Sequence, residues 1–178
     1  MLSFVTAGSR LDDGPRSHPV GENAAEVTTL SAVHSWLPLL RSDRFGDKAS
    51  LVEAITNDND DLVVIDVTHR AQPLTKDDVA RMKFKKIGPR RLVFATMSLG
   101  RAYDWRWYWQ KGWDVGSPSF LFAHDEGAGQ YLTDLSSPEW KALLGKYLTG
   151  IMDLGFDGVM FDDTDTYLWF EDLMPIDR

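Results

Sequence analysis

The sequence predicts an α/β fold built on a parallel sheet, and three features indicate it. Segments typical of strands alternate with segments typical of helices along most of the chain. The expected strands begin near residues 33, 61, 91, 119 and 157, at intervals of 28, 30, 28 and 38 residues. A strand plus a helix at that interval is the βαβ unit, which makes parallel sheets. The run at 61–66 is almost continuously apolar, as in a strand buried on both faces.

The first half of the repeat has a local signal for each element. Residues 33–40 are a short apolar run, and residues 48–57 have apolar side chains at helical spacing. The strand at 61–66 follows. Thr75 is then expected to cap a helix that extends to about Phe84, because its hydroxyl can accept a bond from the first turn.

The second half continues the alternation. Residues 91–97 predict a third strand and residues 119–124 a fourth, with an aromatic segment between them. Pro138 suits the first turn of a helix that extends to about Leu154, where Gly155 stops it. Residues 156–161 predict the fifth strand.

The chain is expected to hold one domain at residues 33–178, preceded by an irregular leader at residues 1–32. Two architectures fit the repeat, a five-stranded doubly wound sheet and a (β/α)8 barrel. A complete barrel needs roughly 250 residues, so five units make only part of one. In both architectures function lies at the carboxyl ends of the strands.

Composition excludes several classes of protein. The 178 residues include 27 acidic and 19 basic side chains, for a net charge of −8, which argues against a nucleic-acid partner. The chain has no cysteine, so disulfides and thiol chemistry are excluded. No apolar run is long enough to predict a membrane span, and residues 1–7 lack the basic start of a signal peptide. Composition leaves oligomeric state open.

Ionisable side chains follow the expected ends of four consecutive strands. They are Asp66 and His69, then Arg101, Asp104 and Arg106, then His124, Asp125 and Glu126, then Asp162, Asp163 and Asp165. One aspartate at such a place is often only a helix cap or a loop charge. Because the feature recurs on four strands, we predict one shared site.

The acidic cluster at 162–165 is the most informative part of that site. Three carboxylates within four residues repel one another unless something cationic binds. They could hold a metal through oxygen ligands or divide acid and nucleophile roles between them. The spacing does not fit a magnesium phosphatase motif, and the histidines lack the spacing of a zinc site. We therefore expect neither a metal nor a cofactor.

The segment Tyr103–Gln110 is rich in aromatic residues. Helical core packing would explain some of them, such as Trp105 and Trp109. Aromatic rings beside carboxylates also hold sugars, with ring on ring and hydroxyls on polar groups. Composition leaves both interpretations open. For Arg106, a bidentate clamp on a strand-end aspartate is favoured over a substrate contact.

Four motifs together resemble glycoside hydrolase family 114, the endo-α-1,4-polygalactosaminidase-like TIM barrels. The motifs are the run 62–66, the segment from Ser98 to Trp109, Pro138-Glu-Trp140, and the segment from Gly155 to Asp165. Their order and spacing match the family over about residues 33–172. The last motif, Gly-Phe-Asp-Gly-Val followed by Asp-Asp-Thr-Asp, is the most specific.

The resemblance implies a secreted or surface (β/α)8 glycosidase that acts on an amino-sugar polymer of the α-1,4-galactosaminan type. It implies that Asp162 is the catalytic aspartate at a strand end and that Asp66 lines the same cleft. The expected substrate contacts are Asp66, Asp104, Arg106, Tyr108, Trp109, Asp163, Asp165 and Tyr167. The partner would be a polysaccharide or oligosaccharide, and the acidic site favours a cationic one.

Two departures from the family pattern bear on catalysis. Tyr103 stands where the family usually has an acidic residue, and Arg101 stands where some relatives have Glu. The family's second catalytic carboxylate lies on a strand beyond the fifth, whereas this chain ends at Arg178. The chain is thus expected to cover about five-eighths of a barrel, as a fragment or a degenerate member.

Three hypotheses follow. The first is a glycoside hydrolase that uses Asp162 with a second carboxylate, for which Asp66, Asp104 or Glu126 are the candidates within this chain. The second is an inactive carbohydrate-binding remnant. The third is an unrelated five-stranded α/β module that binds a cation or small ligand at the switch point of its sheet.

Overall fold

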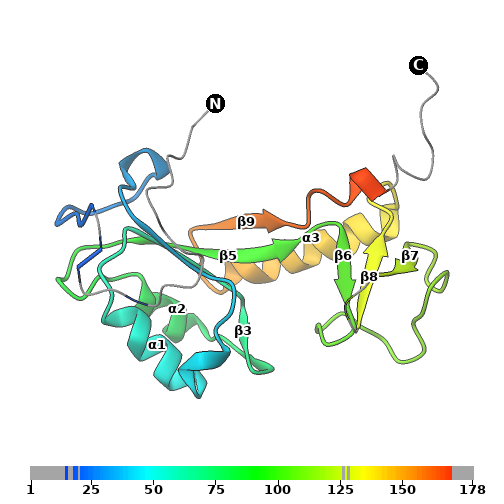
Figure 1. Cartoon of the computed structure of the whole chain (residues 1–178), viewed down its shortest axis with the longest axis horizontal. Helices are drawn as coiled ribbons and strands as arrows, with labels where there is room; N and C mark the ends of the chain where they lie inside the picture. The colour runs from blue at the N-terminus through cyan, green and yellow to red at the C-terminus, as the bar shows by residue number, and fades with distance from the viewer. Residues whose placement is uncertain (1–14, 16–17, 20, 126, 128, 170–178) are drawn as a thin grey trace. The chain divides into compact units, whose positions relative to one another are not determined.

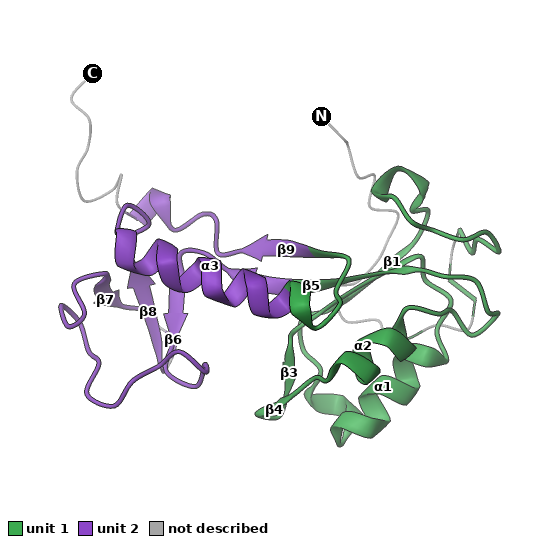
Figure 2. Ribbon diagram, turned by 180° about the vertical axis from the view of Figure 1, so that it is seen from behind, with its two compact units in different colours: residues 1–95, 152–158 green, residues 96–151, 159–178 purple. Residues whose placement is uncertain are grey.

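A computed structural model describes residues 15, 18–19, 21–125, 127 and 129–169 of the chain. The chain divides into two compact units, which Figure 2 draws in different colours. Unit 1 comprises residues 1–95 and 152–158, and unit 2 comprises residues 96–151 and 159–178. Each unit is described by itself.

The elements follow the predicted alternation with several short additions (Figure 1). In chain order they are η1 (Leu30–Ala32), β1 (Trp36–Leu39), η2 (Asp43–Phe45), α1 (Lys48–Thr56), β2 (Leu62–Ile65), β3 (Thr68–His69), β4 (Gln72–Pro73), α2 (Lys76–Met82), β5 (Leu92–Ser98), β6 (Arg101–Tyr103), β7 (Leu121–His124), β8 (Gln130–Thr133), α3 (Pro138–Asp153) and β9 (Gly158–Asp162). None of the helices in the described ranges is long and apolar enough to cross a membrane.

The main sheet has the strand order β1-β2-β5-β9 among the described residues. β1 pairs with β2 in parallel, Trp36 opposite Leu62, and β2 pairs with β5 in parallel, Leu62 opposite Leu92. Every residue of β2 is buried, which agrees with its unbroken apolar run. The prediction of an α/β fold with a parallel sheet is confirmed.

Capping residues fix where the helices of unit 1 begin. The Asp47 carboxylate accepts a bond from the Ser50 backbone N–H at 2.8 Å, so α1 begins at Lys48. Thr75 forms a capping box with Asp78, which confirms the cap predicted for α2. The apolar faces of α1 and α2 are buried, and the two helices contact each other.

The fourth predicted strand is wrong as part of the parallel sheet. β7 belongs to a separate antiparallel sheet with the order β6-β8-β7. Only residues 125–129 separate β7 from β8, which is long enough for a hairpin but too short for the crossover that parallel strands need. β7 also alternates in burial, with Phe122 and His124 exposed. The sequence predicted a parallel strand here because the strand begins at the expected interval, although its two faces differ in burial.

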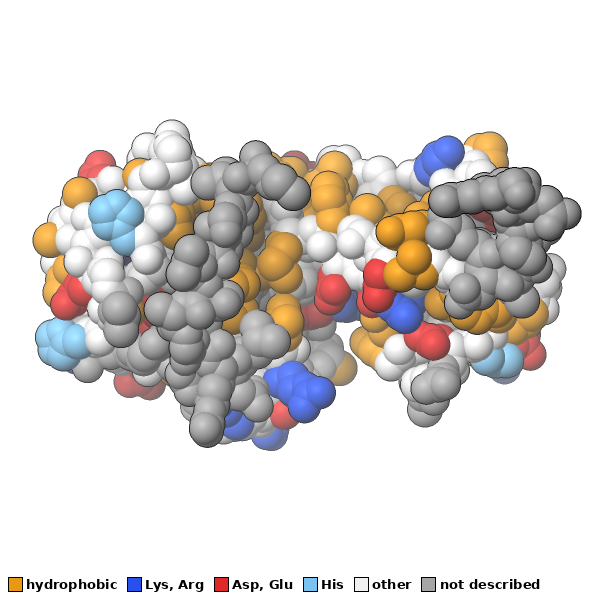
Figure 3. Space-filling model, turned by 45° about the horizontal axis from the view of Figure 1, so that its top comes forward, with side chains coloured by type: hydrophobic (Ala, Val, Ile, Leu, Met, Phe, Trp, Pro, Cys, Tyr) orange, Lys and Arg blue, Asp and Glu red, His pale blue; other side chains and the backbone are white. Residues whose placement is uncertain are grey.

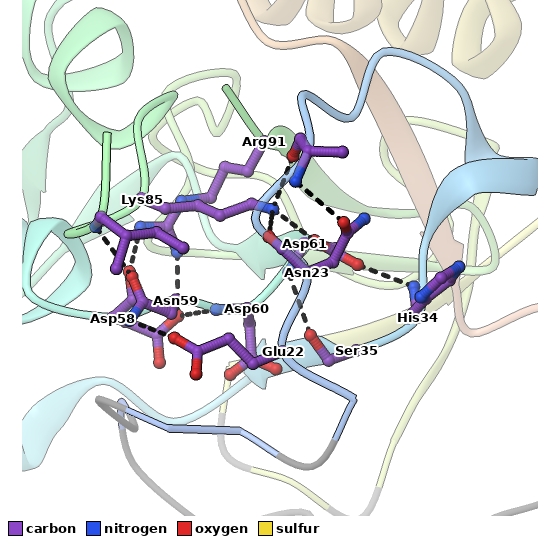
Figure 4. Close-up of polar contacts among 12 residues, drawn as sticks. Glu22, Asn23, His34, Ser35, Asp58, Asn59, Asp60, Asp61, Lys85 and Arg91 are labelled. Carbon is purple, nitrogen blue, oxygen red and sulfur yellow. Dashed lines mark hydrogen bonds and ion pairs between the residues drawn. The ribbon is translucent and has the colours of Figure 1, made fainter. Parts of the chain in front are cut away.

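A buried ionic network lies just before β2 and β5 in unit 1 (Figure 4). Lys85 Nζ lies 2.6 Å from the Asp61 carboxylate, and Arg91 Nη1 lies 2.8 Å from Asp58. All four of these side chains are fully buried. Asp61 also accepts the backbone N–H of His34 at 2.8 Å. These charges lie at the amino-terminal ends of the strands, opposite the end where barrel enzymes place their chemistry, so we assign them a role in stability.

The same network holds part of the segment that precedes β1. Lys85 Nζ donates to the Ala25 carbonyl at 3.1 Å, and Val27 N–H donates to the Arg90 carbonyl at 2.9 Å. Val27 is completely buried. Residues 23–27 therefore cover the amino-terminal ends of the strands of unit 1.

The edge position of β9 predicts self-association of the isolated chain. β9 is last in the sheet order, and Phe161 on it is 51% exposed. An apolar edge strand offers unpaired backbone groups to another chain, and a lysine on the edge opposes such pairing. We expect Phe161→Lys to lower the concentration-dependent association that analytical ultracentrifugation detects. Val115→Lys, which changes an exposed turn residue, is the matched control and should have no effect. A wild-type chain that stays monomeric at high concentration would contradict the prediction.

Candidate functional site

The candidate site of unit 2 begins where β5 and β9 end. β5 ends at Ser98 and β9 ends at Asp162. The Leu99 N–H donates to the Asp162 carbonyl at 3.1 Å, so the two strand ends lie side by side. Figure 1 shows β5 and β9 next to each other and pointing the same way. The residues that follow each strand are therefore brought together.

Asp163 is the centre of this cluster. Its Oδ1 lies 2.6 Å from Arg101 Nη1, and its Oδ2 accepts bonds from the Tyr103 hydroxyl at 2.8 Å and from the Ser98 hydroxyl. Three donors on one carboxylate hold it in one orientation. Asp163 is thus a carboxylate fixed in place by an ion pair and two hydroxyl bonds.

Arg101 links two strand ends. Its Nε lies 2.5 Å from the Asp125 carboxylate after β7, and its Nη1 bonds Asp163 after β9. Burial by itself would lower the pKa of the Arg101 guanidinium, but the bonds that it donates to Asp125 and Asp163 outweigh burial and raise that pKa above its ordinary value. Arg101 therefore remains charged near neutral pH.

Tyr103 acts in this cluster as a neutral hydrogen-bond donor. Burial and the negative charge of Asp163 raise the pKa of the Tyr103 phenol well above its usual range. The phenol stays protonated near neutral pH and donates to Asp163. Such a phenol is unsuited to act as a nucleophile, since the phenolate is not formed.

The loop after β9 packs tightly on Gly100. A Cβ at Gly100 would lie 1.8 Å from Thr166 Oγ1 and 2.5 Å from the Asp163 carbonyl oxygen, so only glycine fits. Asp163 itself has a φ of +54°, in the left-handed region. Its three side-chain bonds offset the cost of that conformation. The strand-end loop is therefore held in one shape by Gly100, Asp163 and Thr166.

Asp162 and Asp165 face solvent on this fixed loop. The Asp162 carboxylate accepts the backbone N–H of Asp163 at 2.8 Å and is exposed. The Asp165 side chain is 73% exposed and lies 3.8 Å from Arg101 Nη1. Figure 3 shows acidic, basic and hydrophobic side chains adjoining one another on the face it draws. Two carboxylates are thus open to a ligand beside one that is fully bonded.

The structure places the other predicted acidic residues at different positions. Asp66 lies in unit 1, where its Oδ1 accepts the N–H and the hydroxyl of Thr68, both at 2.8 Å. Its convergence with Asp162 stays a prediction. Asp104 is exposed in unit 2, and its N–H donates to the Gly129 carbonyl at 3.0 Å. Glu126 lies outside the described residues.

The predicted aromatic and cationic contacts divide into buried and accessible groups. Tyr108 is buried, with its ring edge-on to Trp140 and Tyr147, so its place favours packing over substrate contact. Trp109 is half-buried against Tyr131 at 4.7 Å between ring centroids. Tyr167 is exposed just beyond Asp165.

The Tyr103–Gln110 segment is not a helix. β6 ends at Tyr103, and turns and bends follow through Tyr108, so helical packing does not explain its aromatic residues. Trp105, which we had considered for the core, is 57% exposed. The Arg106 guanidinium lies over the rings of Tyr103 and Tyr147 at 5.9 and 6.0 Å, and the clamp on Asp163 comes from Arg101.

Four members of this cluster were not among the predicted site residues, namely Ser98, Arg101, Tyr103 and Asp125. The sequence did place Arg101 and Asp125 after strand ends, where an isolated cation among acids indicates an ion pair. Neither the spacing of these residues nor the composition could show which strand-end carboxylates would form ion pairs with Arg101. Among the described residues, no group of three or more His, Asp or Glu is arranged to hold a metal ion.

Comparison with known proteins decides the family. A family profile described as glycoside-hydrolase family GH114 matches residues 26–175. The chain belongs to family GH114. This confirms the resemblance that the four motifs indicated, and it excludes an unrelated five-stranded module.

Relatives of this GH114 chain are longer than the chain itself. An uncharacterized protein of Methanocaldococcus jannaschii is 33% identical over 175 residues, which cover 94% of this chain and 49% of the relative. An uncharacterized protein of Deinococcus radiodurans is 38% identical over 78 residues, which cover 43% of this chain and 25% of the relative. The chain therefore spans about half the length of the first of these relatives.

Two solved structures resemble the chain over part of their length. Ega3 of Aspergillus fumigatus, in complex with galactosamine, is 21% identical with a TM-score of 0.52, over 82% of this chain and 49% of that chain. The glycoside hydrolase domain of PelA from Pseudomonas aeruginosa is 20% identical with a TM-score of 0.48, over 75% of this chain and 45% of that one. The Ega3 match confirms a fold that covers part of a TIM-barrel glycosidase domain.

Proposed function

We propose that this GH114 chain is part of a glycoside hydrolase that cleaves an amino-sugar polysaccharide of the α-1,4-galactosaminan type. The observation that carries the proposal is the pair of accessible carboxylates, Asp162 and Asp165, on a loop that Asp163 and Gly100 hold rigid. A rigid support is what a catalytic carboxylate needs to meet its substrate in one geometry.

Asp162 is the proposed catalytic carboxylate. It is the last residue of β9, at the carboxyl end where barrel enzymes carry their catalytic groups. Glycoside hydrolysis needs a second carboxyl group, about 5–5.5 Å away for retention or roughly 6.5–9.5 Å for inversion. Asp163 is a poor choice for that partner, because the Arg101 guanidinium already pairs with it and the Tyr103 hydroxyl bonds it.

The bonding of Asp163 favours a second function for the chain by itself, namely carbohydrate binding without turnover. Asp163 is the carboxylate next to Asp162 in sequence, and its oxygens are occupied by bonds from Arg101, Tyr103 and Ser98. The exposed carboxylates can still attract a sugar. We expect the 178-residue chain to bind amino-sugar oligomers and to hydrolyse them slowly or not at all.

The charge of the site favours a cationic substrate. Arg101 bonds Asp125 and Asp163 closely and lies 3.8 Å from Asp165. One cation therefore faces several carboxylates, and the exposed Asp162 and Asp165 leave the site net negative. A partly deacetylated galactosamine polymer carries ammonium groups that such a site attracts. The solved complex of Ega3 with galactosamine supports this class of ligand by analogy.

Calorimetric titration of the chain with α-1,4-linked galactosamine oligomers tests this proposal. We expect fully deacetylated oligomers to bind up to about 5-fold more tightly than fully acetylated ones, since an exposed ion pair contributes up to about 1 kcal/mol. The preference should vanish near 1 M salt, where charges are screened within about 3 Å. Equal affinity for both oligomers at low salt would contradict the charge argument.

A further inference from the structure

We propose that Trp105 is a sugar-stacking platform of the site, an inference that rests on the proposed function and adds the element that recognises the sugar ring. The sequence left open whether Trp105 packs in the core or holds a sugar, and the structure leaves it 57% exposed in the turn after β6. An indole exposed to this extent forgoes much of the burial that stabilises a tryptophan. A ligand that covers the ring recovers that burial.

The position of Trp105 relative to the carboxylates is set by Tyr103. The two ring centroids are 4.7 Å apart with an interplanar angle of 46°, and the Tyr103 hydroxyl bonds the Asp163 carboxylate at 2.8 Å. One aromatic ring therefore separates the indole from the carboxylate cluster. Asp163 lies between Asp162 and Asp165 on the loop after β9, so we infer that a sugar chain bound at these carboxylates extends over the indole.

Tyr103 also makes the platform rigid. Its hydroxyl is held by Asp163, its backbone N–H donates to the Tyr108 hydroxyl at 3.2 Å, and the Arg106 guanidinium lies 5.9 Å from its ring centroid. Because Tyr103 is held at its hydroxyl and at its backbone, its ring supports the Trp105 ring in one position. A preorganised aromatic surface loses little conformational entropy when a ligand covers it.

A pyranose matches this surface chemically. One face of the ring presents C–H groups that pack on an indole, while the hydroxyl and amino groups at its rim reach polar partners. Stacking depends on the ring and not on the charge of its nitrogen. Trp105 should therefore bind acetylated and deacetylated hexosamines alike, whereas the carboxylates prefer the deacetylated form.

Trp107 provides a matched control within the same turn. It is 59% exposed, as Trp105 is, but its ring contacts Tyr108 and Tyr147 instead of Tyr103. Tyr108 packs edge-on against the buried Trp140 and against Tyr147, whereas Tyr103 bonds the Asp163 carboxylate directly. If exposure alone caused sugar binding, the two tryptophans would contribute equally.

The test measures the affinity of the 178-residue chain for deacetylated and acetylated α-1,4-linked galactosamine oligomers by calorimetry. We expect Trp105→Ala to weaken both about tenfold, the loss of a well-stacked aromatic contact. Trp105→Phe should restore part of the affinity, and Trp107→Ala should change it less than about twofold. Asp165→Asn should weaken only the deacetylated oligomer, because it removes charge and not stacking.

The outcomes separate this inference from the function on which it rests. Wild-type chain that binds neither oligomer would refute the proposed function and the platform with it. Wild-type chain that binds normally, with Trp105→Ala and Trp107→Ala equally affected or both unaffected, would refute the platform alone. Thermal unfolding of each variant shows whether it folds. If Trp105→Ala does not fold, Trp105→Phe decides, since only a stacking role predicts partial affinity in a folded protein.

Discussion

Replacing Asp162 with asparagine should abolish most hydrolysis in a protein that carries this chain within a complete barrel. We expect the rate of hydrolysis to fall about 10²- to 10⁴-fold, the usual contribution of a catalytic acid or base. The amide has nearly the same shape as the carboxylate, so the loop after β9 and its bond from the Asp163 N–H should persist. Substrate affinity should change little, because a catalytic carboxylate acts chiefly on the transition state.

Asp153→Asn is the matched control for that experiment. Asp153 is an exposed aspartate at the end of α3, so its substitution removes the same charge away from the strand ends. The rate with galactosamine oligomers should then equal that of the wild type. Full activity in Asp162→Asn would refute the assignment of the catalytic aspartate, whatever the control shows.

Replacing Lys85 with methionine should lower the free energy of unfolding by about 3–5 kcal/mol. The Lys85 and Asp61 side chains are both fully buried, and their Nζ and Oδ1 atoms are 2.6 Å apart. Removing only the cation leaves the Asp61 carboxylate charged in a place without water, which is the costly way to break a buried pair. The substitution also removes the donor to the Ala25 carbonyl. Urea unfolding measures the change.

Lys83→Met serves as its control. Lys83 pairs with Asp157 at 2.9 Å, but its side chain is 20% exposed and Asp157 keeps a second partner in Arg90. That substitution should change the free energy of unfolding by less than about 1 kcal/mol. Equal losses in the two variants would show that the buried network has no special role in stability.

Local sequence patterns predicted the parallel sheet because they depend on burial and capping alone. The run at 61–66 could only be a doubly covered strand, and Thr75 with Asp78 three residues later formed the expected cap. The strand at 119–124 was wrongly predicted to join the parallel sheet. The interval between strand starts was given more weight than the alternation of exposed and buried residues within this strand. Phe122 and His124 point to solvent in a hairpin that Gly129, with a φ of +72°, helps to turn.

The sequence predicted where the candidate site lies but not which of its side chains bond to one another. The rule that strand ends carry function led to the acidic run at 162–165. It could not show that Asp163 would be bonded by Arg101, Tyr103 and Ser98, since those contacts depend on side-chain geometry across two strands. Nor could periodicity show that Trp105 is exposed while Tyr108 is buried, because the segment between them is an irregular turn.

The central claim is that the ends of β5 and β9 bind an amino sugar, and NMR titration of the labelled chain with deacetylated galactosamine oligomer tests it most directly. We expect the largest amide shifts at residues 98–101 and 162–165, where the Leu99 N–H to Asp162 carbonyl bond joins the strand ends. The indole signal of Trp105 should move with them. Shifts absent from these residues, or concentrated at Asp58–Asp61 and Lys85 in the buried network of unit 1, would contradict the account.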